Sequence, residues 1–214
     1  MLTLILAILI AAALKSRSLL RTAFDGRHSQ TEEEAAISRF DMKPEMTREQ
    51  TKPRISGWLS VLSPEDVAVR SERGMLRGQV FPPLSGDTDA PWAILFHGGA
   101  GTDGSQMLDV ACELSLAGYR VLVPDLYAHG KSDGTYIGFG ALDRYDVVQW
   151  TNKAAELFPD NDIYLHGMSM GAASILQSAD LDLNKNVRGI IADCGFSDLS
   201  TVFRNLVGKL YHLP

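Results

Sequence analysis

A short strand, a glycine–serine turn and a helix follow one another directly between residues 162 and 179. The strand is predicted over Asp162–Leu165, the turn reads His-Gly-Met-Ser-Met-Gly over residues 166–171, and the helix begins at Met170. Glycines two positions before and after Ser169 leave room for a bend so tight that the serine hydroxyl is held exposed at the helix N-terminus. An ordinary turn could carry the same letters, but the place between strand and helix favours a nucleophile elbow.

A second glycine-rich turn, residues 97–101, directly follows the apolar run Trp92–Phe96. That run is predicted to be a central strand, because only a strand buried on both faces is apolar throughout. An acyl-transfer site needs two backbone donors for the developing oxyanion, and we predict the N–H groups of Gly99 and Met170 in this role. A phosphate cradle is the alternative, but the turn is not GxGxxG and has no Walker lysine.

A third motif, Pro124–Ser132, follows a strand predicted at Arg120–Val123 and reads Pro-Asp-Leu-Tyr-Ala-His-Gly-Lys-Ser. Along the chain, the glycine-rich turn comes first, the motif Pro124–Ser132 second and the glycine–serine turn third. With the three motifs in this chain order, the chain resembles the α/β-hydrolase superfamily. Over residues 58–214 it is most similar to bacterial, often membrane-anchored hydrolases of the serine-aminopeptidase-like and acyl-thioester-hydrolase-like branch. Two positions depart from that family: Tyr127 stands where arginine is frequent, and Ala128 where glycine is usual. Shorter likenesses lie at Tyr136–Gly140, Ile191–Cys194 and Tyr211–Pro214.

Short β-rich runs alternate with helical patterns after Trp58, which predicts an α/β domain with a mostly parallel sheet and helices on both faces. The resemblance makes this an α/β-hydrolase fold that lacks its last strands. In chain order we predict an antiparallel hairpin of 66–70 and 76–81, strands at 92–96, 120–123, 162–165 and 187–192, and helices at 107–117, 142–158, 170–179 and 199–210.

The resemblance also implies a catalytic acid after a seventh strand and a catalytic histidine after an eighth, but the sequence given stops at Pro214. A serine is a poor nucleophile unless an imidazole takes its proton and a carboxylate orients that imidazole. We therefore expect a C-terminally truncated chain, with strand 187–192 left as an uncovered sheet edge. A longer reading frame is expected to encode roughly a hundred further residues.

Three histidines and one aspartate near the motifs are candidates for the catalytic base and acid. His97 and His129 are expected to stabilise turns rather than to act as the base, and His166 to point away from the pocket. Asp193 follows the strand after which a few members of the superfamily carry their acid. A role in bracing the next segment is favoured for it, because without a histidine the acid has nothing to orient.

The N-terminal residues 1–21 are predicted to anchor the chain in a membrane. The apolar run Leu2–Leu14 is followed by three cations, Lys15, Arg17 and Arg21. The run is shorter than the ~20 apolar residues that span a bilayer. A cleaved export signal and a buried start are the alternatives, but an export signal normally begins with a basic region, which is absent here.

Residues 22–57 are polar and are predicted to form a linker. Thr31 and Glu34 have the spacing of a capping box, so a short helix is expected that ends near Pro44. This helix either packs on the edge of the domain or lies in a solvated spacer. The hydrolase domain is expected to occupy residues 58–214.

The net charge of -6 argues against a nucleic-acid surface, which needs clustered lysine and arginine. Two cysteines, Cys112 and Cys194, lack metal-ligand spacing and are expected to be buried free thiols, so no metal or cofactor is predicted. The expected function is hydrolysis of an ester, thioester or peptide-like acyl bond, in a small molecule or peptide, through an acyl-enzyme on Ser169. An inactive, truncated, membrane-tethered binding module is the alternative.

Overall fold

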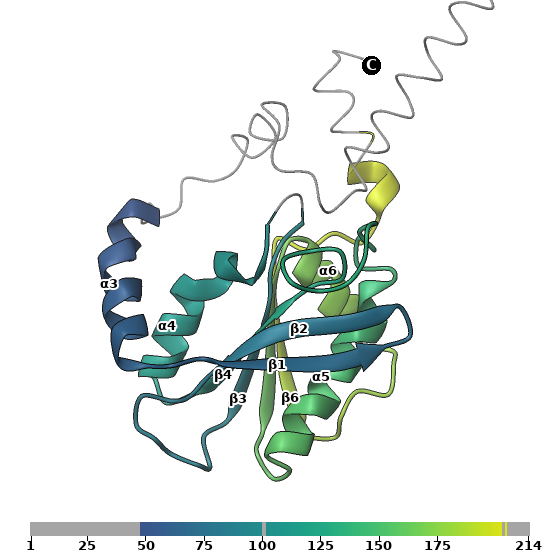
Figure 1. Ribbon diagram of the computed structural model, residues 1–214. Coiled ribbons are helices and arrows are strands. Elements are labelled where there is room, and N and C mark those ends of the chain that lie inside the picture. Colours follow the sequence, from purple (N-terminus) through teal and green to yellow (C-terminus); the bar gives the residue numbers. More distant parts are fainter. Residues whose placement is uncertain (1–47, 100–101, 203, 205–214) are drawn as a thin grey trace, which may run out of the picture.

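The computed structural model describes residues 48–99, 102–202 and 204. They form a six-stranded sheet in the order β1-β2-β4-β3-β5-β6 with helices packed on it (Figure 1). The strands are β1 Glu65–Ser71, β2 Gly74–Phe81, β3 Trp92–Phe96, β4 Arg120–Asp125, β5 Ile163–Met168 and β6 Val187–Asp193. The helices are α3 Arg48–Val61, the 3-10 helix η1 Gly104–Met107, α4 Leu108–Leu116, α5 Asp143–Leu157 and α6 Met170–Gln177.

The sheet begins with an antiparallel hairpin and continues as a parallel sheet. β1 pairs antiparallel with β2 through the two-residue link Glu72-Arg73, and β2 pairs antiparallel with β4. The neighbours β4, β3, β5 and β6 are all parallel. β3 is central and every one of its five residues is buried, as the apolar run predicted. The hairpin and the mostly parallel sheet are thus both confirmed.

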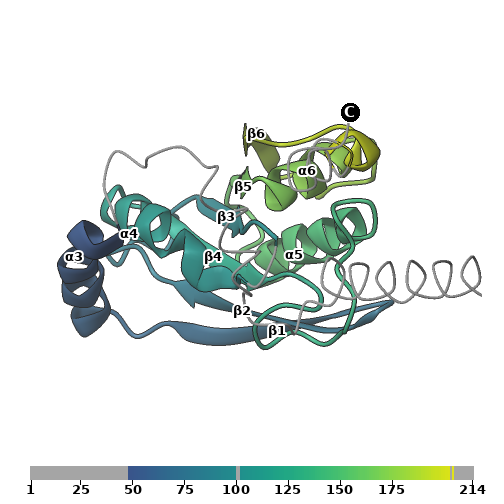
Figure 2. The same ribbon diagram turned by 90° about the horizontal axis from the view of Figure 1, so that it is seen from above.

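Helices cover both faces of the sheet (Figure 2), which confirms the predicted layering. α3 and α4 lie on one face, and α5 and α6 lie on the other. On the first face the Trp58 ring stacks on Phe81 at 4.7 Å, and its indole N–H donates to the hydroxyl of Ser115 at 3.1 Å. On the second face Trp150 is fully buried among residues of β2, β3 and β5. Each face therefore has a core built around a tryptophan, which buries much apolar area at once.

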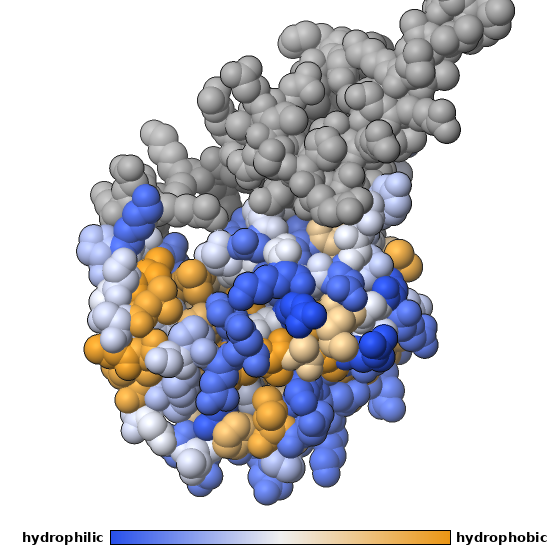
Figure 3. Space-filling view, in the orientation of Figure 1, coloured by the Kyte–Doolittle hydropathy of each residue, from blue (hydrophilic) through white to orange (hydrophobic). Residues whose placement is uncertain are grey.

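α3 is a helix that the sequence did not reveal. Its residues 48–57 have the polar composition that predicted a linker, and the expected domain start at Trp58 lies inside the helix. Trp58 is buried, whereas Leu59 is 37% and Val61 67% exposed. The helix thus docks through few side chains, and Figure 3 shows apolar surface gathered over the region of α3 and α4.

The remaining elements lie within a few residues of their predicted bounds, with one change of type. The helix expected from residue 107 is preceded by η1, whose N-cap is Asp103. The Asp103 carboxylate accepts a hydrogen bond from the Ser105 N–H at 2.9 Å. This turn positions Gln106, a residue that the sequence did not single out.

Several predictions fall on residues outside the described ranges. These are the membrane anchor at 1–21 and the short helix between Thr31 and Pro44. None of the helices within the described ranges has the length and apolar character needed to cross a bilayer. Of the helix predicted at 199–210, residues 199–202 and 204 are described, and they are helical.

β6 is the edge strand of the described sheet, and its last residues are exposed. Ile191 is 61% exposed, and Cys194, which follows the strand, is exposed as well. The prediction of a buried thiol is therefore right for Cys112 and wrong for Cys194. Cys112 lies on the buried face of α4, whereas Cys194 follows β6, a strand that pairs on one side only within the described sheet.

Candidate active site

Ser169 lies in a sharp bend between β5 and α6. Its backbone has φ 51° and ψ −109°, a conformation that residues other than glycine rarely adopt and that stores about 1–3 kcal/mol of strain. The Ser169 C=O accepts the first helical hydrogen bond, from Ala173 N–H at 2.9 Å, and the side chain is partly exposed. The bend predicted from the glycine–serine string is thus present.

The two flanking glycines are required by close backbone approach. A Cβ atom on Gly167 would lie 2.5 Å from the carbonyl carbon of Gly171. A Cβ atom on Gly171 would lie 2.6 Å from the carbonyl carbon of Phe96, closer than real Cβ atoms come. The start of α6 therefore touches both its own strand and the end of β3, and any larger residue would push these elements apart.

The turn after β3 lies beside this bend. The position of a Cβ on Gly98 is 3.7 Å from the Cβ of Ser169, and that of a Cβ on Gly99 is 3.1 Å from the sulfur of Met170. The structure therefore brings together the three residues singled out in the sequence: Ser169, Gly99 and Met170. Gly98, from the glycine-rich turn, lies in this corner too, together with its hydrogen-bond partner Gln106, to which no sequence signal pointed.

His97 is buried and holds two turns in place. Its Nε2 accepts a hydrogen bond from the Leu126 N–H at 3.0 Å, so the ring proton must be on Nδ1, which donates to the C=O of Gly98 at 2.6 Å. Burial, with a smaller contribution from His129, lowers the pKa of His97 to about 3. His97 is thus a neutral, fully engaged ring that stabilises turns, as expected.

His129 is a second buried, neutral imidazole. Its Nδ1 lies 2.9 Å from the C=O of Tyr127, and its ring meets that of His97 edge-on at 5.0 Å. Burial lowers the pKa of His129. Its Nε2 has no hydrogen-bond partner within the described part of the chain. Both rings bond a backbone carbonyl through Nδ1, so neither is oriented by a carboxylate as a catalytic base would be.

His166 and Asp193 lie on two neighbouring strands, β5 and β6. His166 is half-buried on β5, on the same face as Tyr164, whose ring packs against Tyr119 at 6.1 Å beside α4. Burial lowers the pKa of His166, and Asp193 partly offsets this effect. The Asp193 residue is exposed, and its backbone C=O accepts a hydrogen bond from the N–H of Ser169 at 2.8 Å. Asp193 therefore braces the bend through its backbone.

The third motif folds the loop after β4. The Asp125 carboxylate accepts hydrogen bonds from the N–H groups of Gly104 and Lys131, each at 2.8 Å. The Ser132 hydroxyl donates to the backbone C=O of Asp125 at 2.7 Å. Ala128 has φ 65°, the left-handed conformation that explains why glycine is usual at this position. These residues shape the surroundings of the site.

The loop before α5 is fastened to the first hairpin. Arg73 forms ion pairs with the buried carboxylates of Asp143, at 2.8 Å, and of Asp146, and its guanidinium stacks on the Tyr127 ring at 4.3 Å. Asp143 in turn accepts a hydrogen bond from the Gly140 N–H at 2.9 Å. Ile137 and Phe139 from this loop pack in the same core cluster as Met170, so the loop forms one wall beside the bend.

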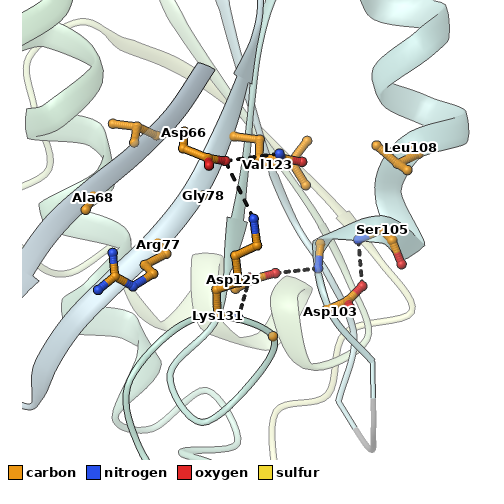
Figure 4. A pocket seen from close by; sticks show the side chains of 14 residues that line it. Asp66, Ala68, Arg77, Gly78, Asp103, Ser105, Leu108, Val123, Asp125 and Lys131 are labelled. Atoms are coloured by element: carbon orange, nitrogen blue, oxygen red, sulfur yellow. Dashed lines mark hydrogen bonds and ion pairs between the residues drawn. The ribbon is translucent and has the colours of Figure 1, made fainter. Parts of the chain in front are cut away.

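A groove of about 720 Å³ lies on the α4 face of the sheet, beside η1 (Figure 4). Asp66, Arg77 and Lys131 line it, and so does Ser105. None of its lining residues comes from the bend at Ser169 or from the turn after β3. No cluster of side chains suited to a metal ion occurs among the residues that the structure describes.

Comparison with known proteins identifies one matching family. The profile of the family described as "Serine aminopeptidase, S33" matches residues 89–210, more than half of the chain. A search of the curated proteins finds no match.

Solved structures of similar shape include hydrolases from distant organisms. An esterase of Pyrococcus furiosus is 23% identical, with a TM-score of 0.62 over 81% of this chain and 66% of that one. In another crystal form of that esterase, this chain covers 62% of its length. An α/β hydrolase of a Penicillium species is 22% identical, with a TM-score of 0.52 over 71% and 53% of the two chains. Protein Est1E of Butyrivibrio proteoclasticus, bound to ferulic acid, is 23% identical, with a TM-score of 0.52 over 59% and 51%.

Proposed function

Because this chain belongs to the serine aminopeptidase (S33) family of α/β hydrolases, we propose that it carries an acyl-transfer site in which Ser169 is the nucleophile. The likeness to solved esterase structures confirms the α/β-hydrolase fold. The chain covers 62% of the length of the Pyrococcus furiosus esterase in one crystal form and 66% in another, so the proposed activity rests on the residues of this chain.

The proposed reaction is hydrolysis of an ester, thioester or peptide-like acyl bond. The Ser169 oxygen adds to the acyl carbon, the alcohol, thiol or amine leaves with a proton, and water then releases the acid from the serine. The N–H groups of Gly99 and Met170 stabilise the negative oxygen of each tetrahedral intermediate. No step needs a metal or a cofactor.

One observation carries this proposal: the turn after β3 lies against the bend that displays Ser169. The 3.7 Å between the Ser169 Cβ and the Cβ position of Gly98 puts backbone donors next to the serine. Ser169 is also the N-cap of α6, so the partial positive charge of the helix N-terminus favours a developing anion there. A glycine–serine turn without a catalytic role would not need this strained and costly arrangement.

The base is the part of the mechanism that the described residues do not supply. His97 is fully engaged, and His129 is held by a backbone carbonyl. We therefore expect the reactivity that an oxyanion hole gives without a triad, about 10³–10⁴-fold above water in serine proteases that lack a triad member. This rate enhancement is low for an enzyme with a complete triad, but it is far above the reactivity of an ordinary exposed serine.

The test is labelling of the 214-residue chain with a fluorophosphonate probe, followed by mass spectrometry to locate the modified serine. Slow labelling of Ser169 is expected, faster by about 10³ than at Ser105, a matched exposed serine. Ser169→Ala should abolish this signal, and Ser105→Ala should leave it unchanged. Equal labelling of Ser169 and Ser105 would instead support the non-catalytic alternative.

The same protein can then be offered activated ester, thioester and aminoacyl substrates. An acyl group found on Ser169 after one of these and not the others would define which acyl bond the site accepts.

A further inference from the structure

Gln106 approaches the turn after β3 from η1. We propose that Gln106 is a positioning residue that decides which backbone N–H of this turn, that of Gly98 or that of Gly99, is presented to Ser169. This inference deepens the proposed function and rests on it for its catalytic consequence. Its structural content concerns the orientation of one peptide group and can be tested separately.

The N–H of Gly98 is already occupied. It donates to the Gln106 side-chain oxygen Oε1 at 2.6 Å. Gly98 is buried, so without this acceptor its N–H would be left without a partner at a cost of about 1–3 kcal/mol. An N–H that is bound in this way does not stabilise a substrate oxygen. Gln106 therefore removes one of the two candidate donors.

The C=O of Gly98 is fixed as well. It accepts hydrogen bonds from the Thr102 hydroxyl at 2.8 Å and from His97 Nδ1 at 2.6 Å. The described backbone has no cis peptide bond, and in a trans peptide the C=O of one residue points opposite to the N–H of the next. Holding the Gly98 C=O toward Thr102 thus turns the Gly99 N–H to the opposite side. The bonds to the Gly98 C=O thus set the orientation of the Gly99 donor, and the bond from the Gly98 N–H to Gln106 fixes the peptide that precedes it.

Gln106 is close enough to the serine for this effect to matter. A Cβ on Gly98 would lie 3.1 Å from Gln106 Oε1, 3.7 Å from Gln106 Nε2 and 3.7 Å from the Ser169 Cβ. Gln106 and Ser169 thus flank the same glycine. The backbone that carries the Gln106 side-chain amide is also held in place. The 3-10 helix η1 is capped by Asp103 and is tied to β4 through the hydrogen bond from Gly104 N–H to Asp125.

Two adjacent glycines make the turn dependent on such a support. Gly98 and Gly99 have no Cβ, so the peptides on both sides of Gly98 can rotate between orientations that other residues exclude. Gln106 holds the first of these peptides, and Thr102 and His97 hold the second. A catalytic donor that is misplaced by about 1 Å can cost about 10²-fold in rate. Gln106 is thus expected to act on the rate of acylation, and much less on binding of the reagent.

The reactivity test compares Gln106→Met, which keeps the length of the side chain but removes the acceptor, with Ser105→Ala as the matched control on η1. In Gln106→Met we expect the maximal rate of fluorophosphonate labelling at Ser169 to fall about 10–100-fold. The probe concentration that gives half of this maximal rate should change less than about threefold. Ser105→Ala should match the parent protein. An equal fall in both variants, or a change confined to half-saturation, would overturn the proposal.

Gln106→Glu provides a rescue with a pH signature. Its protonated carboxyl keeps an acceptor for Gly98 N–H and carries no charge, whereas its carboxylate opposes the oxyanion. The labelling rate of this variant relative to the parent should therefore rise as pH falls from about 8 toward about 5, near the ordinary glutamate pKa of about 4.3. The ratio for Gln106→Met should stay flat. A flat ratio for both variants would contradict the proposed role.

Amide hydrogen exchange measured by NMR decides the structural claim whether or not Ser169 reacts. In the parent protein the Gly98 amide should be protected and the Gly99 amide should exchange fast. In Gln106→Met the Gly98 amide should exchange about tenfold faster or more. Unchanged exchange at Gly98 would overturn the proposal, even with Ser169 reactive. If Ser169 fails to label in the parent protein, the proposed function fails, and the exchange of Gly98 and Gly99 still tests Gln106.

Discussion

The backbone N–H of Ser169 donates a hydrogen bond to the backbone C=O of Asp193 at 2.8 Å. This bond ties the strained bend after β5 to the last residue of β6. Strained conformations persist only where their surroundings enforce them, and here β6 and the start of α6 provide that support from two sides. The position of the serine therefore depends on the edge strand as well as on the glycine–serine turn.

Replacing Ser169 by glycine should separate stability from reactivity. Glycine adopts φ 51° without steric penalty, so Ser169→Gly is expected to raise the free energy of unfolding by about 1 kcal/mol relative to Ser169→Ala. Both variants should lose fluorophosphonate labelling. Urea denaturation of the two variants measures the difference, and equal stability would mean that the bend is not strained.

Gly171→Ala should be among the most damaging small substitutions. The added methyl group would run into the carbonyl group of Phe96, which cannot move without shifting β3, so a loss of about 3 kcal/mol is expected. Gly57→Ala is the matched control, because nothing lies within 4 Å of a Cβ at that position on α3. There the same change should stabilise the protein by about 0.5–1 kcal/mol. Thermal denaturation of both variants tests the contrast.

Buried neutral histidines should make the fold sensitive to acid. The pKa of His97 is lowered to about 3 in the folded protein, from the ordinary value of 6.5, so the unfolded chain takes up this proton first. The contribution of His97 to the free energy of unfolding should therefore fall as pH drops from about 6.5 toward about 3, by about 1.4 kcal/mol per pH unit. Asp146, whose pKa burial raises to about 6 from 3.8, acts in the opposite direction between those two values.

His97→Gln isolates the histidine contribution. Glutamine keeps an acceptor for the Leu126 N–H but cannot be protonated in this range. Denaturant titrations over the same pH series give the free energy of unfolding as a function of pH. The slope of this plot should be lower by about 1.4 kcal/mol per pH unit in His97→Gln than in the parent protein. Parallel curves for the two proteins would argue against a neutral His97.

Arg73→Met should destabilise the loop beside the bend. The change leaves the buried carboxylates of Asp143 and Asp146 without their cation, which is expected to cost about 3 kcal/mol. Arg70→Met, at an exposed position on the neighbouring strand, should change stability by less than about 0.5 kcal/mol. Adding Asp146→Asn to Arg73→Met should recover part of the loss, and a full double-mutant cycle measures how much.

Local pattern was sufficient to predict most of the fold. The five apolar residues of β3 are typical of a strand in the centre of a sheet, and the glycine spacing around Ser169, between a strand and a helix, favours a tight bend. The turn after β3 was also placed correctly beside Ser169, because parallel strands end at the same edge of a sheet. These features are encoded within about ten consecutive residues.

Features that depend on distant partners could not be predicted. α3 has little amphipathic pattern and contains Pro53, and Trp58, the one buried residue among its residues 51–61, gives no helical period. Gln106 and Arg73 each owe their role to a residue that only the folded chain brings near. Cys194 is exposed because its strand lies at the edge of the described sheet, which its own sequence does not reveal. The membrane anchor and the missing triad residues stay predictions.

The ion pairs of Arg73 with Asp143 and Asp146 join residues that are 70 and 73 positions apart in the chain. Contacts of such separation form after local ones, because the long intervening loop must first be closed. We therefore expect the wall beside Ser169 to assemble late during refolding, after the hairpin and α5 have formed on their own. Pulse-labelling exchange should then show the Gly140 amide becoming protected later than the amides that pair β1 with β2.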